Sequence, residues 1–364
     1  MISLRFAHAL ALAAFVAAPT ASAAEHWVYF GTYTGGKDGS KGIHRSKFDD
    51  ATGKLSEPEV AAEMGSPSFL AIHPNKKFLY AVGEGQGKDG GAVVAFAMDV
   101  KTGKLTKLND DKSGGPGPCH IVISPKGDLA AIANYGGGST CVFAVEADGK
   151  LGKRVGFFQH KGEKAPHGHC CAFNAAGDHL YTVDLGLNRV KVFHVGKKGV
   201  EEDTEEDVIT PAGSGPRHMA FHPAGGAFYV CGELDSTVNV VKGNKVVQSL
   251  STLPKATKGN STAECIISAD GKFVYVSNRG HNSVAVFKVK DDKTVEAAGH
   301  ITGDIKTPRN FNIDPSGKWM LIASQAGDKV GVWERDAATG GAKETGTTVK
   351  ISKCVCVKFV TVEK

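Results

Sequence analysis

Residues 215–233 read GPRHMAFHPAGGAFYVCGE, and five variants of this stretch recur along the chain. The variants occupy residues 66–84, 117–135, 165–184, 262–280 and 307–325. They follow one another at intervals of roughly 45 to 51 residues, a period typical of four-stranded propeller blades. Each variant has two short runs rich in β-branched and aromatic residues, separated by a turn usually built from Pro or Ala with Gly. The repeat therefore predicts an all-β fold.

Two further strands follow the copies, so each blade is predicted to have four antiparallel strands. The six copies account for six blades, and the segments 27–34, 42–55 and 355–363 predict a seventh. We expect the two chain ends to share this blade, because closing the ring hides the exposed strand edges. Residues 24–364 are thus predicted to form a single seven-bladed β-propeller domain. A solenoid of stacked repeats is the structural alternative.

Residues 1–23 have the three parts of a secretory signal peptide. Arg5 supplies the positive charge, residues 9–18 form a short apolar segment, and the Ala-Ser-Ala at 21–23 is a cleavage site. We therefore expect an exported, periplasmic or extracellular protein without a membrane span after cleavage, an uncleaved anchor being the alternative. The net charge of +5 over 364 residues, with no long basic run, argues against a nucleic-acid partner.

Eight cysteines in an exported chain raise the question of disulfides. Most of them lie in or beside predicted strands, where cysteine often serves as a small buried hydrophobic residue. We expect between zero and two disulfides. Because the sequence contains no C-x-x-C pair, it argues against a structural zinc site. We expect no metal, no other cofactor, and a monomer.

The copies differ most at the polar residues that flank their strands. With the innermost strand lining the axis, the repeated turns lie on one face of the ring. The starts of the innermost strands and the ends of the second strands lie on the other face, which we call the mouth. Unpaired charges are costly in a core, and converging polar groups favour a binding site. The candidates gathered there are His120, Asn134, His167, His169, Asp184, Arg217, Glu233, Arg279 and Arg309.

Several motifs together resemble the lactonase family of seven-bladed propellers, which includes propeller-type 6-phosphogluconolactonases and carboxy-muconate cyclases. They are GTYTGG, GPCH, ANYGGGS, PHGH, GPRH, VSNRGHNSVAVF and TPRNFNIDPSG, within residues 27–336. The resemblance implies seven blades and a lactone-related activity. The active residues proposed for the family fall on His167 or His169, Arg217, Glu233 and Arg279. This chain departs from the family at Gly232, where an Asn usually precedes the glutamate, and in its predicted export.

Lactone hydrolysis needs a base to activate water and positive donors for the developing oxyanion. We assign Glu233 as the candidate base, with His169 or His167 as the alternative base or as the acid. Arg217 and Arg279 would hold the substrate anion and the oxyanion.

Four further residues are candidates for substrate binding: Arg309, His120, Asn134 and Asp184. The structural alternatives are that Glu233 and Arg217 form an ion pair between blades and that Arg279 caps a loop. We expect His218 and His222 to pack against the strand or cap it.

The sequence thus predicts an exported hydrolase of carbohydrate metabolism that acts on a small anionic lactone, 6-phosphogluconolactone or a related aldonolactone. A G-x-S-x-G motif is missing from the sequence, which argues against a serine triad. A non-catalytic propeller that binds an anionic ligand or a protein through the same mouth is one alternative. A muconate-type lactonising cyclase is a narrower one.

Overall fold

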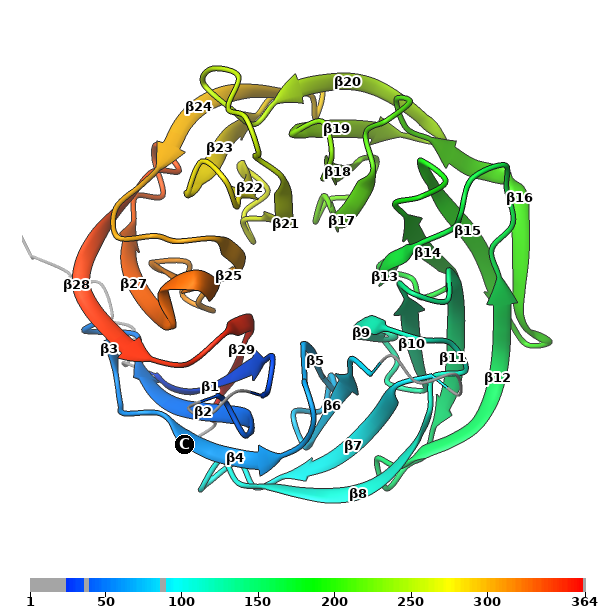
Figure 1. Cartoon of the computed structure of the whole chain (residues 1–364), viewed down its shortest axis with the longest axis horizontal. Coiled ribbons are helices and arrows are strands. Elements are labelled where there is room, and N and C mark those ends of the chain that lie inside the picture. Colours follow the sequence, from blue (N-terminus) through cyan, green and yellow to red (C-terminus); the bar gives the residue numbers. More distant parts are fainter. Residues whose placement is uncertain (1–23, 36–38, 86–89, 363–364) are drawn as a thin grey trace, which may run out of the picture.

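Seven β-sheets surround a central axis in the computed structural model of the chain (Figure 1). The structure describes residues 24–35, 39–85 and 90–362. The predicted signal peptide, residues 1–23, lies outside the described residues. The all-β, seven-bladed prediction is confirmed. The one helical element of the described ranges is a single 3-10 turn, η1 (Gln325–Gly327).

Six blades have four antiparallel strands that follow one another outward from the axis. Blades 2 to 4 comprise β5 (Phe69–Ile72), β6 (Phe78–Gly83), β7 (Ala92–Met98) and β8 (Leu105–Lys112); β9 (Pro118–Ile123), β10 (Leu129–Asn134), β11 (Ser139–Val145) and β12 (Leu151–Gln159); β13 (Gly168–Phe173), β14 (His179–Asp184), β15 (Arg189–Gly196) and β16 (Gly199–Ile209). Blades 5 to 7 comprise β17 (Pro216–Phe221), β18 (Phe228–Gly232), β19 (Thr237–Lys242) and β20 (Lys245–Ser251); β21 (Thr262–Ile267), β22 (Phe273–Asn278), β23 (Ser283–Val289) and β24 (Val295–Ile301); β25 (Pro308–Ile313), β26 (Trp319–Ser324), β27 (Lys329–Arg335) and β28 (Ala342–Lys350).

Blade 1 joins the two ends of the chain. Its innermost strand is the C-terminal β29 (Cys354–Thr361), which pairs antiparallel with β1 (Glu25–Thr32). Next comes β2 (Gly42–Asp49), whose outer edge pairs with β3 (Lys54–Leu55) and β4 (Glu59–Glu63). The ring is therefore closed by a shared blade, as the sequence predicts.

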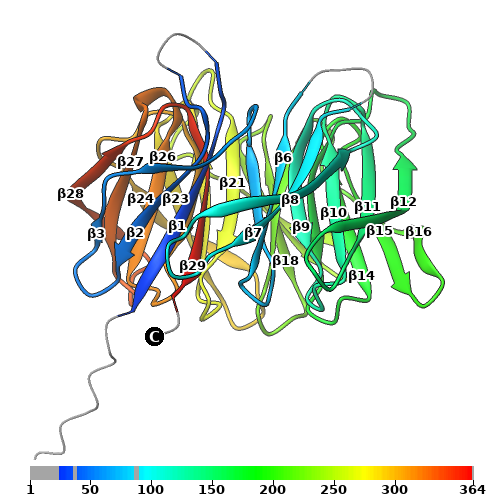
Figure 2. The same cartoon turned by 90° about the horizontal axis from the view of Figure 1, so that it is seen from below.

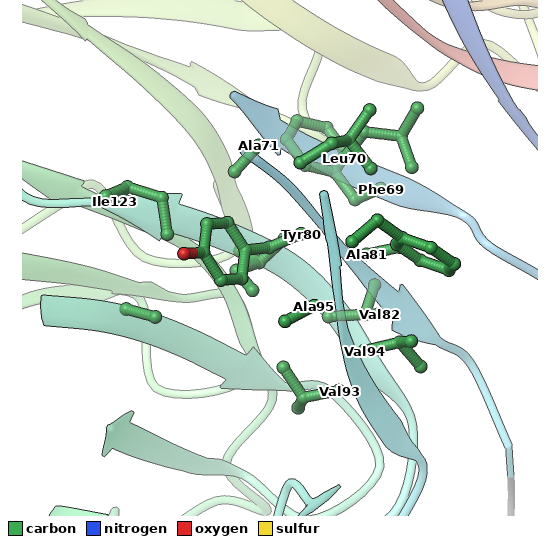
Figure 3. Packing of buried hydrophobic residues seen from close by; sticks show 14 of the residues in the cluster. Phe69, Leu70, Ala71, Tyr80, Ala81, Val82, Val93, Val94, Ala95 and Ile123 are labelled. Carbon is green, nitrogen blue, oxygen red and sulfur yellow. The ribbon is translucent and has the colours of Figure 1, made fainter. Parts of the chain in front are cut away.

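Apolar side chains fill the space between neighbouring sheets. Figure 3 shows Tyr80 and Val82 of β6 packed among residues of β5 and β7, with Ile123 of the next blade beside them. The Tyr80 hydroxyl donates 2.8 Å to the carbonyl of Gly149 in the next blade. Three more tyrosines on second strands make the same kind of bond to the following blade: Tyr29 to Gly103, Tyr229 to Lys293 and Tyr275 to Gly340. These bonds fix the angle between blades.

Figure 2 shows the ring from its edge, with loops and turns on its two faces. The repeated turns join first to second strands on one face, and a glycine such as Gly127 (φ +80°) or Gly317 (φ +76°) takes the left-handed conformation there. The mouth lies on the opposite face. All eight cysteines are buried free thiols, which agrees with the expectation of zero to two disulfides.

Six of the seven innermost strands share one irregularity near the mouth, and β5 pairs with β6 without it. The register shifts between Pro216 and Met219 where β17 pairs with β18, and a shift at the same place occurs in β9, β13, β21, β25 and β29. A bulge interrupts the alternation of a strand and can re-aim a side chain. Consecutive residues, such as Arg217 and His218, therefore both reach the axis and are both buried.

Candidate active site

Arg217, Glu233 and Arg279 meet at the mouth from two neighbouring blades. Arg217 is the second residue of β17, Glu233 follows the end of β18, and Arg279 follows the end of β22. Arg217 Nε lies 2.9 Å from Glu233 Oε2, and Arg279 Nη2 lies 2.5 Å from Glu233 Oε1. Both arginines also donate to backbone carbonyls of β21, at Ala263 and Thr262. The predicted convergence of these three side chains is therefore present.

The two arginines determine the protonation state of Glu233. Burial alone would raise the pKa of this carboxyl, but the positive charges of Arg217 and Arg279 outweigh burial and lower the pKa below its ordinary value. Glu233 is therefore an ionised partner of both guanidinium groups. A carboxylate held in this way accepts a proton reluctantly, so its geometry suits a positioning role better than that of a base.

The departure from the family pattern at Gly232 leaves Glu233 in place. A Cβ at position 232 would lie 2.2 Å from Asp235 Oδ1 and 2.4 Å from Ser214 Oγ. Polar atoms of neighbouring residues thus occupy the space that a side chain at this position would need. Because the backbone N–H of Glu233 still donates to Gly215, the residue keeps its place at the mouth.

Arg309 reaches the mouth from β25 and contacts a residue that the sequence analysis missed. Its Nη2 donates 3.1 Å to the hydroxyl of Tyr33, and its guanidinium lies 5.5 Å from the centre of that ring. The Tyr33 hydroxyl in turn donates 2.9 Å to Glu84. The only sequence signal for Tyr33 is its place in the GTYTGG motif. Three arginines face two carboxylates here, which leaves the mouth with an excess of positive charge.

His167 and His169 lie at different depths beside Tyr135. The ring of His167 stacks on Tyr135 at 4.6 Å, and its Nδ1 lies 3.0 Å from the Tyr135 carbonyl. His169 is buried, with its Nδ1 3.8 Å from the thiol of Cys119. Burial, with help from the charge of Arg217, holds the pKa of His169 well below its ordinary range. Both histidines are near the mouth, and His169 is a neutral ring in its wall.

His120, which we expected at the mouth as a substrate-binding residue, lines the channel cavity and not the mouth cavity. Its ring packs 4.0 Å from Phe69 and 5.2 Å from His218, and its Nδ1 accepts a hydrogen bond from the backbone of Cys171. Burial lowers the pKa of His120 well below its ordinary value. This residue packs in the channel under the mouth, so the prediction that it lies at the mouth was wrong.

His218 and Glu264 form a buried pair in the same layer. His218 Nδ1 lies 2.8 Å from Glu264 Oε1, and the side-chain amide of Asn310 donates to the other oxygen, Oε2. Within the described residues, His218 Nε2 has no hydrogen-bond partner. The sequence predicts that His218 packs against its strand or caps it. The bulge in β17 instead turns it toward the axis, and no pattern in the sequence announces that bulge.

Asn134 and Asp184 do not reach the mouth. The side chain of Asn134 is fully buried and donates to Ser139 Oγ and to the carbonyl of Ser113. Asp184 is also fully buried, and it accepts hydrogen bonds from His160 and from the backbone of His167. Both side chains hold loops in place, so the prediction that they contact the substrate was wrong.

Asn134 and Asp184 miss the mouth because they lie one residue earlier in their blades than Glu233 does in its own. Asn134 and Asp184 are the last residues of β10 and β14, whereas Glu233 follows the last residue of β18. Successive side chains along a strand point in opposite directions. A residue one position earlier therefore points into the blade instead of into the mouth. In the other six blades, the equivalent residue also follows the second strand, and its N–H bonds to the chain at or just before the start of the innermost strand. These residues are Tyr33, Glu84, Tyr135, Leu185, Arg279 and Gln325.

Two cavities follow one another along the axis. The one at the mouth has a volume of ≈ 10 Å³ and is lined by Tyr33, Glu84, Arg217, His218 and Arg309, among others. A larger cavity of ≈ 270 Å³ lies in the channel and is lined by all seven innermost strands. Phe69 and His218 line both cavities and so lie between them.

Clusters that could hold a metal ion lie away from the mouth in the part of the chain that the structure describes. One joins His179, His194 and Glu206 on blade 4, and the other joins His26 to two aspartates. His179 and His26 belong to the face of the repeated turns. In the same described ranges, no helix has the length and apolar character needed to cross a membrane.

The comparisons with known proteins agree with this geometry. Residues 27–359 match the family described as "Lactonase, 7-bladed beta-propeller". The chain belongs to this lactonase family of seven-bladed β-propellers.

Individual relatives match over almost their whole length. A 6-phosphogluconolactonase of Bacillus subtilis is 34% identical over 91% of this chain and 97% of its own. The crystal structure of a putative 6-phosphogluconolactonase of Bacteroides fragilis is 33% identical, with a TM-score of 0.87 over 94% of this chain and 100% of its own. A periplasmic gluconolactonase of Pseudomonas aeruginosa has a TM-score of 0.86 and 27% identity over 93% of this chain and 100% of its own.

Proposed function

We propose that the protein hydrolyses a small anionic sugar lactone, 6-phosphogluconolactone or a related aldonolactone, at the mouth. The observation that carries this proposal is the cluster of Arg217, Arg279 and Glu233, with Arg309 adding further positive charge beside it. Relatives named 6-phosphogluconolactonase, 34% and 33% identical over most of the chain, support the substrate class.

The arginines supply the anion-binding part of the site. A guanidinium presents N–H donors in a fixed fork that suits carboxylate, phosphate or an oxyanion. Arg279 uses Nη2 for Glu233 and for a backbone carbonyl, while its buried Nε has no hydrogen-bond partner within the described part of the chain. Glu233 fixes both arginines before the substrate binds, which spares their reorganisation during the reaction.

Water activation falls to a histidine of the mouth rather than to Glu233. A base works best when its pKa lies near the working pH. The two arginines lower the pKa of Glu233 and so move it further from neutral pH. A neutral imidazole has an available lone pair at pH 7. His169 and His218 both lie within reach of the charge of Arg217, and His167 stacks on Tyr135, which also contacts His169.

We further propose that the protein works outside the cytoplasm as a monomer. The signal-like residues 1–23 support export, as does the likeness to the periplasmic gluconolactonase. Cell fractionation of a producing strain is expected to place the shortened chain in the periplasm or medium. Recovery of the full-length chain in the cytoplasm would contradict the export.

The activity is tested with the purified mature protein on a panel of aldonolactones and phosphorylated lactones, with a chelator present. We expect hydrolysis of at least one anionic lactone well above the uncatalysed rate. Arg279→Ala is expected to raise KM for that lactone about tenfold, since a charge-assisted contact is lost. Absence of turnover across the panel, with ligand binding retained, would instead support a non-catalytic propeller.

A further inference from the structure

We propose that His218 is the general base of this site, and that Glu264 and Asn310 are the residues that position it. The proposal rests on the proposed lactonase function. Its basis is the ring's geometry: Nδ1 lies 2.8 Å from Glu264 Oε1, while Nε2 has no hydrogen-bond partner in the described ranges. A proton on Nδ1, donated to the carboxylate, leaves the lone pair on Nε2.

The carboxylate partner distinguishes His218 from the other two candidates. A base that must hold one tautomer and one orientation is commonly fixed by a third group. His169 has only a thiol 3.8 Å from its Nδ1, and His167 is held by a backbone carbonyl. Glu264 is itself fixed, because Asn310 and the backbone N–H of Cys265 both donate to it.

The side chain of His218 is buried and borders a cavity large enough for a reacting water. His218 lines the mouth cavity of ≈ 10 Å³ together with Arg217 and Arg309. A volume of about 10 to 15 Å³ is what one water needs. One water would therefore fit in this cavity, between the imidazole of His218 and the guanidinium groups of Arg217 and Arg309. We place the lactone above it, at the mouth.

The step is balanced within the chain and its substrate. His218 Nε2 takes one proton from the water while the water oxygen forms a bond to the lactone carbonyl carbon. The carbonyl electron pair moves to the oxygen, and the arginines stabilise that oxyanion. When the pair returns, the ring C–O bond breaks, and the leaving alkoxide takes the proton back from His218. Lactone and water become the hydroxy acid, and the imidazole is regenerated.

The surroundings keep His218 neutral at pH 7. Burial and the charge of Arg217 lower its pKa, and Glu264 opposes them by stabilising the protonated ring. Titratable and charged groups surround His218 in both cavities: Tyr33, Glu84, Cys119, His120, His169, Cys170, Arg217, Glu264, Arg309 and Lys358. Since the base is the neutral form, activity is expected to fall as pH drops through the pKa of His218.

The first test compares His218→Gln with His222→Gln on the lactone that the wild-type protein hydrolyses. His222 follows the same strand at its other end and is our matched control. We expect His218→Gln to lower kcat by about 100-fold or more with little change in KM, the usual size for loss of a general base. His222→Gln is expected to keep the wild-type kcat. A kcat of His218→Gln within threefold of wild type would overturn the proposal.

The second test uses Glu264→Gln and remains informative if His218→Gln does not fold. Removing the carboxylate charge lowers the pKa of His218 further, so the acid limb of log kcat/KM against pH is expected to move to lower pH, with a lower maximum. A purely structural Glu264 would leave the limb where it is, and that result would overturn the positioning role. A wild-type protein without turnover would refute the lactonase function itself, which separates the two failures.

Discussion

Two buried histidine–carboxylate pairs in this propeller differ in one hydrogen bond. His160 Nδ1 lies 2.6 Å from Asp184, and His218 Nδ1 lies 2.8 Å from Glu264. His160 Nε2 is also engaged, 2.8 Å from Thr140 Oγ1, whereas His218 Nε2 is without a hydrogen-bond partner among the described residues. The first pair is closed and holds a loop. The second is open toward the mouth.

The difference shows how the same pair of residue types serves structure in one place and chemistry in another. A buried polar atom left without a partner costs about 1 to 3 kcal/mol. A pair that only stabilised the fold would gain by closing, as His160 does with Thr140. His26, paired with Asp50 on the opposite face, also has an unpartnered ring nitrogen, Nδ1. His218 differs from His26 because it borders the mouth cavity together with Arg217 and Arg309.

The largest expected contrast is between His160→Gln and His218→Gln. His160→Gln removes a bond within the blade interface, so we expect the free energy of unfolding to fall by about 2 to 4 kcal/mol. Its kcat is expected to stay within about threefold of wild type, against a loss of about 100-fold in His218→Gln. Urea denaturation and steady-state kinetics measure the two quantities. Equal catalytic losses in both variants would remove the distinction between the pairs.

The variant Glu233→Gln tests whether Glu233 has a structural role, as Asp184 does, or takes part in the chemistry. Loss of its charge frees Arg217 and Arg279 from their common partner. We expect KM for the anionic lactone to rise about tenfold while the acid limb of the pH profile stays in place. Steady-state kinetics between about pH 5 and about pH 9 measure both KM and the position of the acid limb. Disappearance of the acid limb would return the base role to Glu233.

Thr140→Val opens the closed pair artificially. The variant removes the hydroxyl that bonds His160 Nε2 and that also donates to Thr182. We expect the free energy of unfolding to fall by about 1 to 3 kcal/mol, the cost of a buried group without its partner. Chemical denaturation measures the change. An unchanged free energy of unfolding would mean that a buried ring nitrogen without a partner carries no energetic cost in this protein. The unpartnered Nε2 of His218 would then no longer indicate a binding site.

The smallest expected effect concerns the pH dependence of stability. The folded-state pKa of His218 is lowered, so the unfolded chain binds this proton first as pH falls below about 6.5. Stability from this group is complete above the unfolded pKa and is lost below it. His218→Gln is expected to reduce the slope of unfolding free energy against pH by up to about 1.4 kcal/mol per unit. Denaturation at several values between pH 7 and pH 5 measures it, and identical slopes would contradict the neutral ring.

The fold and part of the site could be predicted because they depend on local patterns. The repeat determines the blades, and ring closure brings the starts of the innermost strands together, so Arg217, Glu233 and Arg279 were predicted to converge. Whether a polar side chain there is free depends on its neighbours. Asn134 and Asp184 find partners in Ser113 and His160, which are distant in sequence, and no local pattern reports this.

His218 shows the second limit of the sequence. In a regular strand, adjacent side chains point in opposite directions, so an axial Arg217 predicts that its neighbour faces away. The bulge in β17 cancels that rule. Because the bulge arises from pairing with β18, it becomes visible only in the folded structure.

The central claim is tested most directly by the protonation state of His218 itself. Nitrogen NMR of the protein labelled in its histidines, with His218→Gln to assign the signal, reports which ring nitrogen carries the proton. We predict a neutral ring at pH 7 with the proton on Nδ1 and a bare Nε2. A proton on Nε2 of a neutral ring, or a charged ring at that pH, would contradict the account.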